Sequence, residues 1–305
     1  ETLTTAVHTF TNGGGYHDIG FRLNSGTFFR PFISGNATYR DRVIAVGPAP
    51  ASMRINGEAA FQSCGSLRAF DATVVATGGT SFSSAWFGCS SLTSFPLINT
   101  AGVTNFYQAW HSCSSLTSFP LVNTANATSV SAAWYNCSGL TSFPLINTAA
   151  ATNFYEAWQG CSGLTSFPLI NTASGTNFQT AWAGCSGLAS FPLINTGAGT
   201  TFRSSWQNCS SLTSFPLIAT GAGTTFREAW DGCFNLTSFP LINTAAGTDF
   251  NYTWRSCSNL TSFPLINTGA GTNFSFAWVN CSGLTAFPLI NTGAGTAFGQ
   301  TWGNC

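Results

Sequence analysis

The sequence repeats itself every 24 residues over most of its length. Reading from Cys89 gives CSSLTSFPLINTAGVTNFYQAWHS, then CSSLTSFPLVNTANATSVSAAWYN, and the cycle continues without an insertion to Cys305. All eleven cysteines and all ten tryptophans lie on this lattice, and each tryptophan from Trp86 onward stands three residues before a cysteine. Because a fixed period of roughly 20–50 residues marks stacked repeats, the sequence predicts a repeat solenoid of about ten turns.

The chain divides into residues 1–57 and residues 58–305. From Glu58 onward the repeat register is present, first in a degraded form. The earlier part does not repeat, and its stretches GFRLNSGTFFRPFIS and DRVIAV, punctuated by glycine and proline, predict short strands joined by turns. We expect a β-rich N-terminal cap or attachment segment that covers the open end of the stack, since a terminal repeat must hide its unpaired edge.

One repeat begins with LTSFPL, residues Leu92 to Leu97. Side chains alternate along a strand, so the spacing predicts a short strand in which Phe95 and Leu97 point to the same, inner side. Pro96 lacks a backbone donor and would interrupt the hydrogen bonding of each strand at one fixed level. The segment that follows, from Asn99 to Gly102, has the residues of a turn.

The return segment of the repeat, TNFYQAWHSC, places apolar residues on one side of a short helix or 3₁₀ turn. Phe106, Ala109, Trp110 and Cys113 stand at spacings of three, four and seven, which is the spacing of one helical face. The predicted fold is therefore a parallel β-coil with a short strand and a short helical or 3₁₀ return per repeat. We expect continuous buried columns made of Phe95, Leu97, Trp110, Cys113 and their copies.

These residues resemble a known family. The string AWHSCSSLTSFPL looks like the BspA-type leucine-rich repeat of bacterial surface proteins, whose A-F-x-x-C-x-x-L core is matched by Ala60 to Leu67. The longer string VTNFYQAWHSCSSLTSF resembles the related mycoplasma-type surface lipoprotein repeat, and similar arrays occur in phage proteins. The resemblance covers residues 58–305 and implies a leucine-rich-repeat solenoid. For function it implies adhesion or host-surface binding, on a virion fibre or a bacterial surface.

The eleven cysteines raise the alternatives of disulfides, a metal site or buried thiols. Parallel side chains in a ladder and an odd number of cysteines disfavour disulfides. The sequence has no C-x-x-C pair and only three histidines, so the spacing of a zinc site is absent. We expect reduced cysteines that behave as small buried apolar residues, with no metal and no cofactor.

Composition excludes several classes of partner and reaction. Charged residues make up 6% of the chain, lysine is absent and the net charge is zero, which argues against a nucleic-acid partner. No apolar run approaches the roughly 18 residues of a membrane span. The few acids and bases of the repeats are scattered over different turns, without a nucleophile, a base and an orienting group together. The sequence therefore predicts neither an enzyme nor membrane insertion.

Variation among the repeats is concentrated in the two pairs of residues that flank Ala-Trp. In successive repeats they read YQ/HS, SA/YN, YE/QG, QT/AG, RS/QN, RE/DG, NY/RS, SF/VN and GQ/GN. Two interpretations remain open: relaxed constraint on an exposed side, or a binding face carried by a rigid scaffold. Under the second interpretation the candidate binding residues are Tyr107, His111, Tyr135, Tyr155, Glu156, Arg203, Arg227, Asp231, Tyr252 and Arg255.

Two function classes follow. The first is an extracellular adhesion or recognition module, on a virion or cell surface, that binds a glycan or protein of a host or neighbouring surface. The second is a structural fibre or spacer made of stacked repeats. Ice binding through threonine ladders such as Thr93 and Thr100 is a third class, but no strand carries two threonines in a flat T-x-T pattern.

The last repeat predicts a route to self-association. It would expose Leu289, Phe298 and Trp302 together with a row of unpaired backbone groups, and such an edge is a template for another chain. We expect either that the native polypeptide continues past Cys305 or that a second subunit covers this turn. A head-to-tail contact of that kind would build an open fibre.

Overall fold

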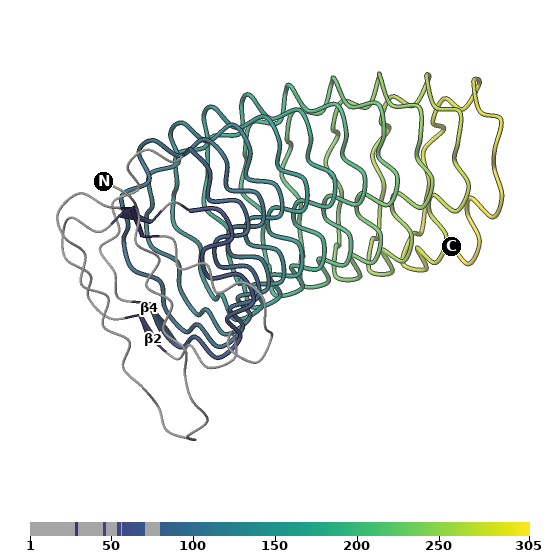
Figure 1. Ribbon diagram of the computed structural model, residues 1–305. Coiled ribbons are helices and arrows are strands. Elements are labelled where there is room, and N and C mark those ends of the chain that lie inside the picture. The colour runs from purple at the N-terminus through teal and green to yellow at the C-terminus, as the bar shows by residue number, and fades with distance from the viewer. Residues whose placement is uncertain (1–27, 30–44, 47–53, 56, 71–79) are drawn as a thin grey trace.

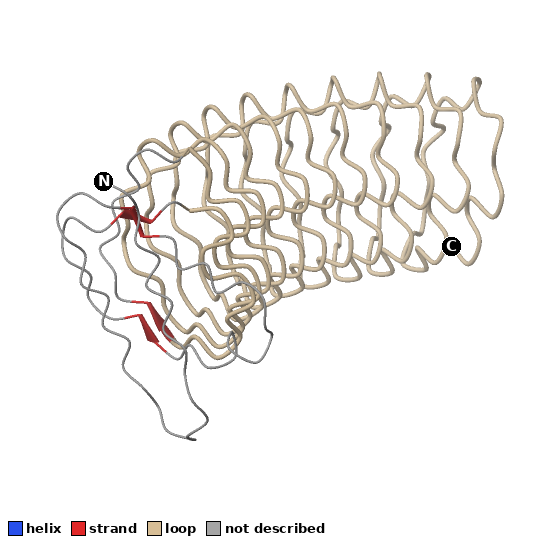
Figure 2. Cartoon of the chain, viewed as in Figure 1, coloured by secondary structure: helices blue, strands red, loops and turns tan. Residues whose placement is uncertain are grey.

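The computed structural model describes residues 28–29, 45–46, 54–55, 57–70 and 80–305 (Figure 1). From residue 80 the chain winds into a coil whose turns follow one another along one axis in chain order. Strands occur only near the N-terminal end of the described chain, and the turns of the coil consist of loops (Figure 2). The strands are β1 (Phe28–Phe29), β2 (Ala45–Val46), β3 (Arg54–Ile55) and β4 (Ala69–Phe70).

These strands pair in parallel at offsets of about one repeat. In the pair β1–β3, Phe28 lies opposite Arg54, and in the pair β2–β4, Ala45 lies opposite Ala69. Strands β1 and β2 fall in the two stretches where the sequence predicts them, so that prediction is confirmed. The division at residue 57 and the capping role of the first segment remain predictions, since most of residues 1–57 lies outside the described residues.

One side of each turn, which we call the Trp arm, is the segment Phe106–Cys113 and its copies. Every second backbone amide of the arm donates to the next turn: Trp110 N to Ala133 O at 2.8 Å, for example, and Ser112 N to Tyr135 O at 2.7 Å. The amides between them close three-residue turns within the arm, as His111 N does to Gln108 O at 3.2 Å. The arm thus binds its neighbour along the stack and still curls tightly on itself.

This alternation requires two left-handed residues in each Trp arm. Gln108 has φ 54° and Ser112 has φ 61°, and both values recur in the copies of these residues. The copies of Ser112 are only glycine, serine or asparagine, and glycine and asparagine are the residues that tolerate this conformation best. The predicted burial of Phe106, Ala109 and Trp110 is confirmed, but the arm is a chain of turns and not a helix.

The opposite side of each turn, the Phe arm, is the segment Leu116–Val122 and its copies. Leu116, Phe119 and Val122 are buried at a spacing of three, whereas Leu121 is exposed. Val122 N donates to Pro120 O at 2.9 Å and closes a tight turn with Leu121 at its tip. A period of three resembles a polyproline II segment more than a strand.

The prediction for the Phe arm is therefore wrong in one respect. Phe95 is buried as expected, but Leu97 is 63% exposed and Ile98 takes the inner position at 3%. The segment 92–97 is not a strand, and the described turns are joined instead by single parallel bridges such as Asn105 to Ser129. Proline leaves no backbone donor for a strand ladder, so the arm follows the three-residue period and directs the leucine outward.

Aromatic columns fill the core between the two arms. The indole rings of successive repeats stack with centroids 5.0–6.0 Å apart. Trp110 also meets Phe95 and Phe119 edge-on across the coil, at 5.3 and 4.7 Å. Because the two arms face each other through these rings, their outer surfaces lie on opposite sides of the coil.

Cysteine supplies a buried donor between neighbouring turns. Cys113 Sγ donates to Trp86 O at 3.2 Å and Cys137 Sγ to Trp110 O at 3.0 Å, and the cysteines through Cys281 repeat the contact. Burial raises the pKa of Cys137 to about 12, so the thiol stays protonated. This geometry supports the expectation of reduced, buried cysteines.

The turn that leaves the Phe arm is fixed by asparagine and threonine. Asn99 Oδ1 accepts the Ala101 amide at 3.1 Å, and the buried Thr100 hydroxyl donates to Asn123 O of the next turn at 2.5 Å. Threonine therefore bonds from turn to turn. Since Thr100 is buried, it cannot belong to an exposed ice-binding ladder.

Candidate binding face

The side chains that vary between repeats project from the outer surface of the Trp arm. We call the positions of Tyr107, Gln108 and His111, with their copies, the variable face. They alternate with the buried residues Ala109 and Trp110, so the backbone that fills the core also fixes the direction of the variable side chains. Of the candidate residues, Tyr107 and Arg203 are exposed, Asp231 is buried, and His111, Tyr135, Tyr155, Glu156, Arg227, Tyr252 and Arg255 are half-buried.

The N-terminal half of the variable face is aromatic. The rings of Phe87, His111 and Tyr135 form a stack in three successive turns, with centroids 4.5 and 4.4 Å apart. Burial lowers the pKa of His111, which keeps its imidazole neutral at pH 7. Ser112 Oγ lies 2.8 Å from His111 Nδ1 and fixes the ring through a hydrogen bond. The stack is consequently rigid and uncharged.

Tyr155 and Glu156 add a polar pair beside this stack. The hydrogen bond to Glu156, together with burial and the negative charge of that carboxylate, raises the pKa of Tyr155 to about 12. Tyr155 therefore remains a neutral hydroxyl. Tyr107 stands two turns earlier in the same column, with the small Ser131 between them. This half of the face offers tyrosine rings and a carboxylate to a ligand.

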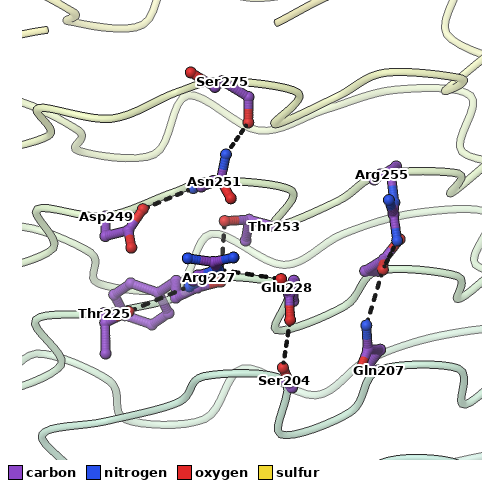
Figure 3. A network of polar contacts seen from close by, with 12 residues as sticks. Ser204, Gln207, Thr225, Arg227, Glu228, Asp249, Asn251, Thr253, Arg255 and Ser275 are labelled. Carbon is purple, nitrogen blue, oxygen red and sulfur yellow. Dashed lines mark hydrogen bonds and ion pairs between the residues drawn. The ribbon is translucent and has the colours of Figure 1, made fainter. Parts of the chain in front are cut away.

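The C-terminal half of the variable face is a charged network (Figure 3). Arg227 Nε donates to Glu228 Oε1 at 3.1 Å, and the other carboxylate oxygen of Glu228 accepts the Ser204 hydroxyl at 2.9 Å. The network therefore runs across two turns as well as along one. Nearby, Asp249 accepts the Asn251 amide, and Asn251 Nδ2 reaches Ser275 O at 2.9 Å.

A second network in this half is centred on Asp231, which is only 3% exposed. Arg255 binds both oxygens of its carboxylate, at 2.7 and 2.5 Å, and Gln207 Nε2 donates to it at 3.0 Å. These bonds raise the pKa of Arg255. The guanidinium also lies 4.5 Å from the centre of the Tyr252 ring. Asp231 thus lies beneath the face and positions Arg255, and it is not itself a contact residue.

The structure brings the candidate residues together in two groups and adds members that the sequence did not single out. Phe87 begins the aromatic stack, Gln207 and Ser204 complete the networks, and Phe276 stacks on Tyr252 at 4.6 Å. Reading the repeats by column would have found them, since each stands 24 residues from a candidate. The serine, asparagine or glycine that ends each variable pair is fixed by its φ and does not vary freely.

Binding is the chemistry that this arrangement supports. Within the described residues, no group of three or more His, Cys, Asp or Glu side chains could hold a metal ion. The carboxylates of the face are engaged by arginine, serine, tyrosine or backbone groups, and none is paired with a nucleophile. In the same part of the chain, no helix is long and apolar enough to cross a bilayer.

Parallel turns of about 24 residues, buried leucine, phenylalanine and cysteine columns and loops in place of helices define a leucine-rich-repeat solenoid. The description of the BspA type leucine rich repeat region, six copies long, matches residues 48–165, 132–261 and 179–292. Together these matches span most of the sequence. The chain belongs to the BspA-type leucine-rich-repeat family.

Solved structures of repeat proteins are similar at low identity. A leucine-rich repeat protein from Bacteroides ovatus is 17% identical, with 87% of this chain and 77% of that chain covered and a TM-score of 0.46. A leucine rich cell surface protein from Faecalibacterium prausnitzii is 20% identical, with 86% and 82% covered and a TM-score of 0.42. No curated protein matches the chain. At these values the assignment depends on the family match.

Proposed function

We propose that this protein is a non-enzymatic recognition module, exposed on a virion fibre or a bacterial surface, whose variable face binds a glycan or protein of another surface. One observation carries the proposal. Repeats that are otherwise nearly identical differ mainly on the outer surface of the Trp arm, and there the side chains form ordered stacks and networks. Preorganised side chains on a rigid scaffold lose little entropy on binding.

A surface glycan is the ligand class that the face fits best. Tyr107, Tyr155 and Tyr252 offer aromatic rings with polar edges, and Arg203 and Arg227 offer donors for hydroxyl and carboxylate groups. The polar networks supply both donors and acceptors within a few ångströms. A protein partner remains the alternative, because tyrosine and arginine also dominate protein interfaces.

A structural fibre or spacer is the second candidate function. It is favoured by the Phe arm, whose outer surface barely changes between repeats. A spacer needs regular stacking and no specific contact, so its variable face would tolerate any polar substitution. Binding measurements on variants of that face separate the two functions.

The test is binding of the full chain to a printed array of bacterial surface glycans. Replacing Tyr107, Arg203 and Arg227 by alanine should lower binding by at least about tenfold, because contact residues of these types each contribute ~1 kcal/mol or more. The matched control replaces the exposed serines 118, 166 and 190 of the Phe arm by alanine and should bind as the wild type does. Equal binding by both variants, or no glycan bound by the wild type, contradicts the glycan assignment.

A further inference from the structure

The outer surface of the Phe arm carries a continuous row of exposed leucines. We call it the leucine ridge, and its members are Leu97, Leu121, Leu145, Leu169, Leu193, Leu217, Leu241, Leu265 and Leu289. The first eight are each 60–63% exposed. Each stands at the tip of a tight turn, where the backbone holds it outward. The ridge therefore follows from the fold and recurs in every repeat.

The apolar area of the ridge exceeds what a monomer commonly leaves open. A leucine side chain has roughly 100 Å² of apolar surface, so eight of them at about three fifths exposure present ~500 Å². The largest apolar patch of a typical soluble monomer is of about this size, and it often marks a contact site. With the flanking serine, proline and asparagine columns, the surface approaches the ~800 Å² per partner of a standard protein interface.

The charge and spacing of this surface fit a second copy of the same chain. The columns of Thr93, Ser94, Pro96, Leu97 and Asn99 contain no ionisable residue in any repeat from residue 92 onward. Two identical surfaces can therefore meet without like charges facing each other, which the variable face with its arginines and carboxylates could not do. Because both ridges have the same spacing between turns, leucines in register at one turn stay in register along the whole row.

We propose that two copies of this protein pair side by side through their leucine ridges. The contact is isologous, so each chain offers the same surface and the pair closes as a dimer. Since the ridge lies on the opposite side of the coil from the variable face, the dimer presents two variable faces outward. This contact differs from an end-to-end association through the last turn, which would build a fibre.

The test is the mass of the full chain in solution, measured by sedimentation equilibrium over a range of concentrations. The wild type should have the mass of two chains, and a Leu169→Glu/Leu193→Glu variant should have the mass of one. Both leucines are exposed, so the variant should keep its melting temperature and its circular dichroism. A Leu169→Ser/Leu193→Ser variant removes the apolar contact without adding charge and should raise the dissociation constant at least tenfold.

The matched control adds the same charge to the other side of the coil. A Gln108→Glu/Gln179→Glu variant should remain a dimer. A monomeric wild type, or a dimer that survives both ridge variants, overturns the proposal. A monomeric wild type that sediments with phosphatidylcholine vesicles, and a ridge variant that does not, also overturns it and assigns the ridge to lipid.

Discussion

On the leucine ridge every repeat from Leu97 to Leu289 presents the same residue, whereas on the variable face a tyrosine in one turn is a serine or an arginine in another. Both surfaces are outside the core, so burial does not explain the difference. The backbone hydrogen bonds and aromatic columns hold the coil together without either set of side chains. Each surface is therefore free to serve a separate contact, the ridge a constant one and the variable face a specific one.

The first way to break this comparison is to damage the core that separates the two surfaces. Trp182 is fully buried and stacks on Trp158 and Trp206 at 5.6 and 5.7 Å. Trp182→Ala should lower the free energy of unfolding by roughly 3–5 kcal/mol, because it leaves a large cavity. Urea denaturation measures it. A loss similar to that of an exposed leucine would show that the two arms do not pack through this column.

A smaller effect is expected within the variable face itself. Arg255→Ala leaves the buried carboxylate of Asp231 with only Gln207 as a side-chain partner, and this should cost roughly 1–3 kcal/mol. Arg203 is exposed, and its replacement by alanine should change stability by less than ~0.5 kcal/mol. Denaturant midpoints compare the two variants. Equal values would mean that the Asp231 network does not order the face.

The cysteine columns give a chemical probe of both arms. Burial raises the pKa of Cys137, Cys209 and Cys281 to about 12, so at pH 9 only roughly a thousandth of each would be the reactive thiolate. Iodoacetamide at pH 9 should label Cys305, which is exposed, and leave these three intact. Stability owed to the neutral thiols is fully present below the ordinary cysteine pKa and is lost as the pH rises through about 12.

Mass mapping of the labelled protein supplies the readout, and reductant should leave the melting temperature unchanged. Labelling of Cys209 in the folded protein would contradict its burial. A peptide that links Cys161 to Cys185 would contradict the reduced state of the column.

How much could be predicted from the sequence differs between the two arms. Period and composition predicted the solenoid, the buried Phe95 and Trp110 columns and the side on which the variable residues lie. They missed the outward turn of Leu97, because a strand was assumed where Pro96 and its copies impose a three-residue period. The pairing of Arg255 with Asp231 was also beyond reach, since it joins side chains of neighbouring turns.

The smallest predicted effect concerns the backbone beneath the variable face. Thr180 has φ 53°, which is unfavourable for a β-branched residue, so Thr180→Gly should be neutral or stabilise by up to ~1 kcal/mol. The matched control is Ala181→Gly, at a buried position without positive φ, which should destabilise by about 1 kcal/mol. Thermal unfolding compares them. Equal destabilisation by both would contradict the alternating turn of the Trp arm.

The central claim is that foreign surfaces are bound by the variable face and not by the leucine ridge. Hydroxyl-radical footprinting of the full chain, with and without the oligosaccharide that binds most strongly on the array, locates the contact residue by residue. We predict that Tyr107, Tyr155 and Tyr252 lose reactivity on binding, while Leu145 and Leu169 keep the reactivity they have in the unliganded protein. Protection of the leucines with unchanged tyrosines would contradict the account.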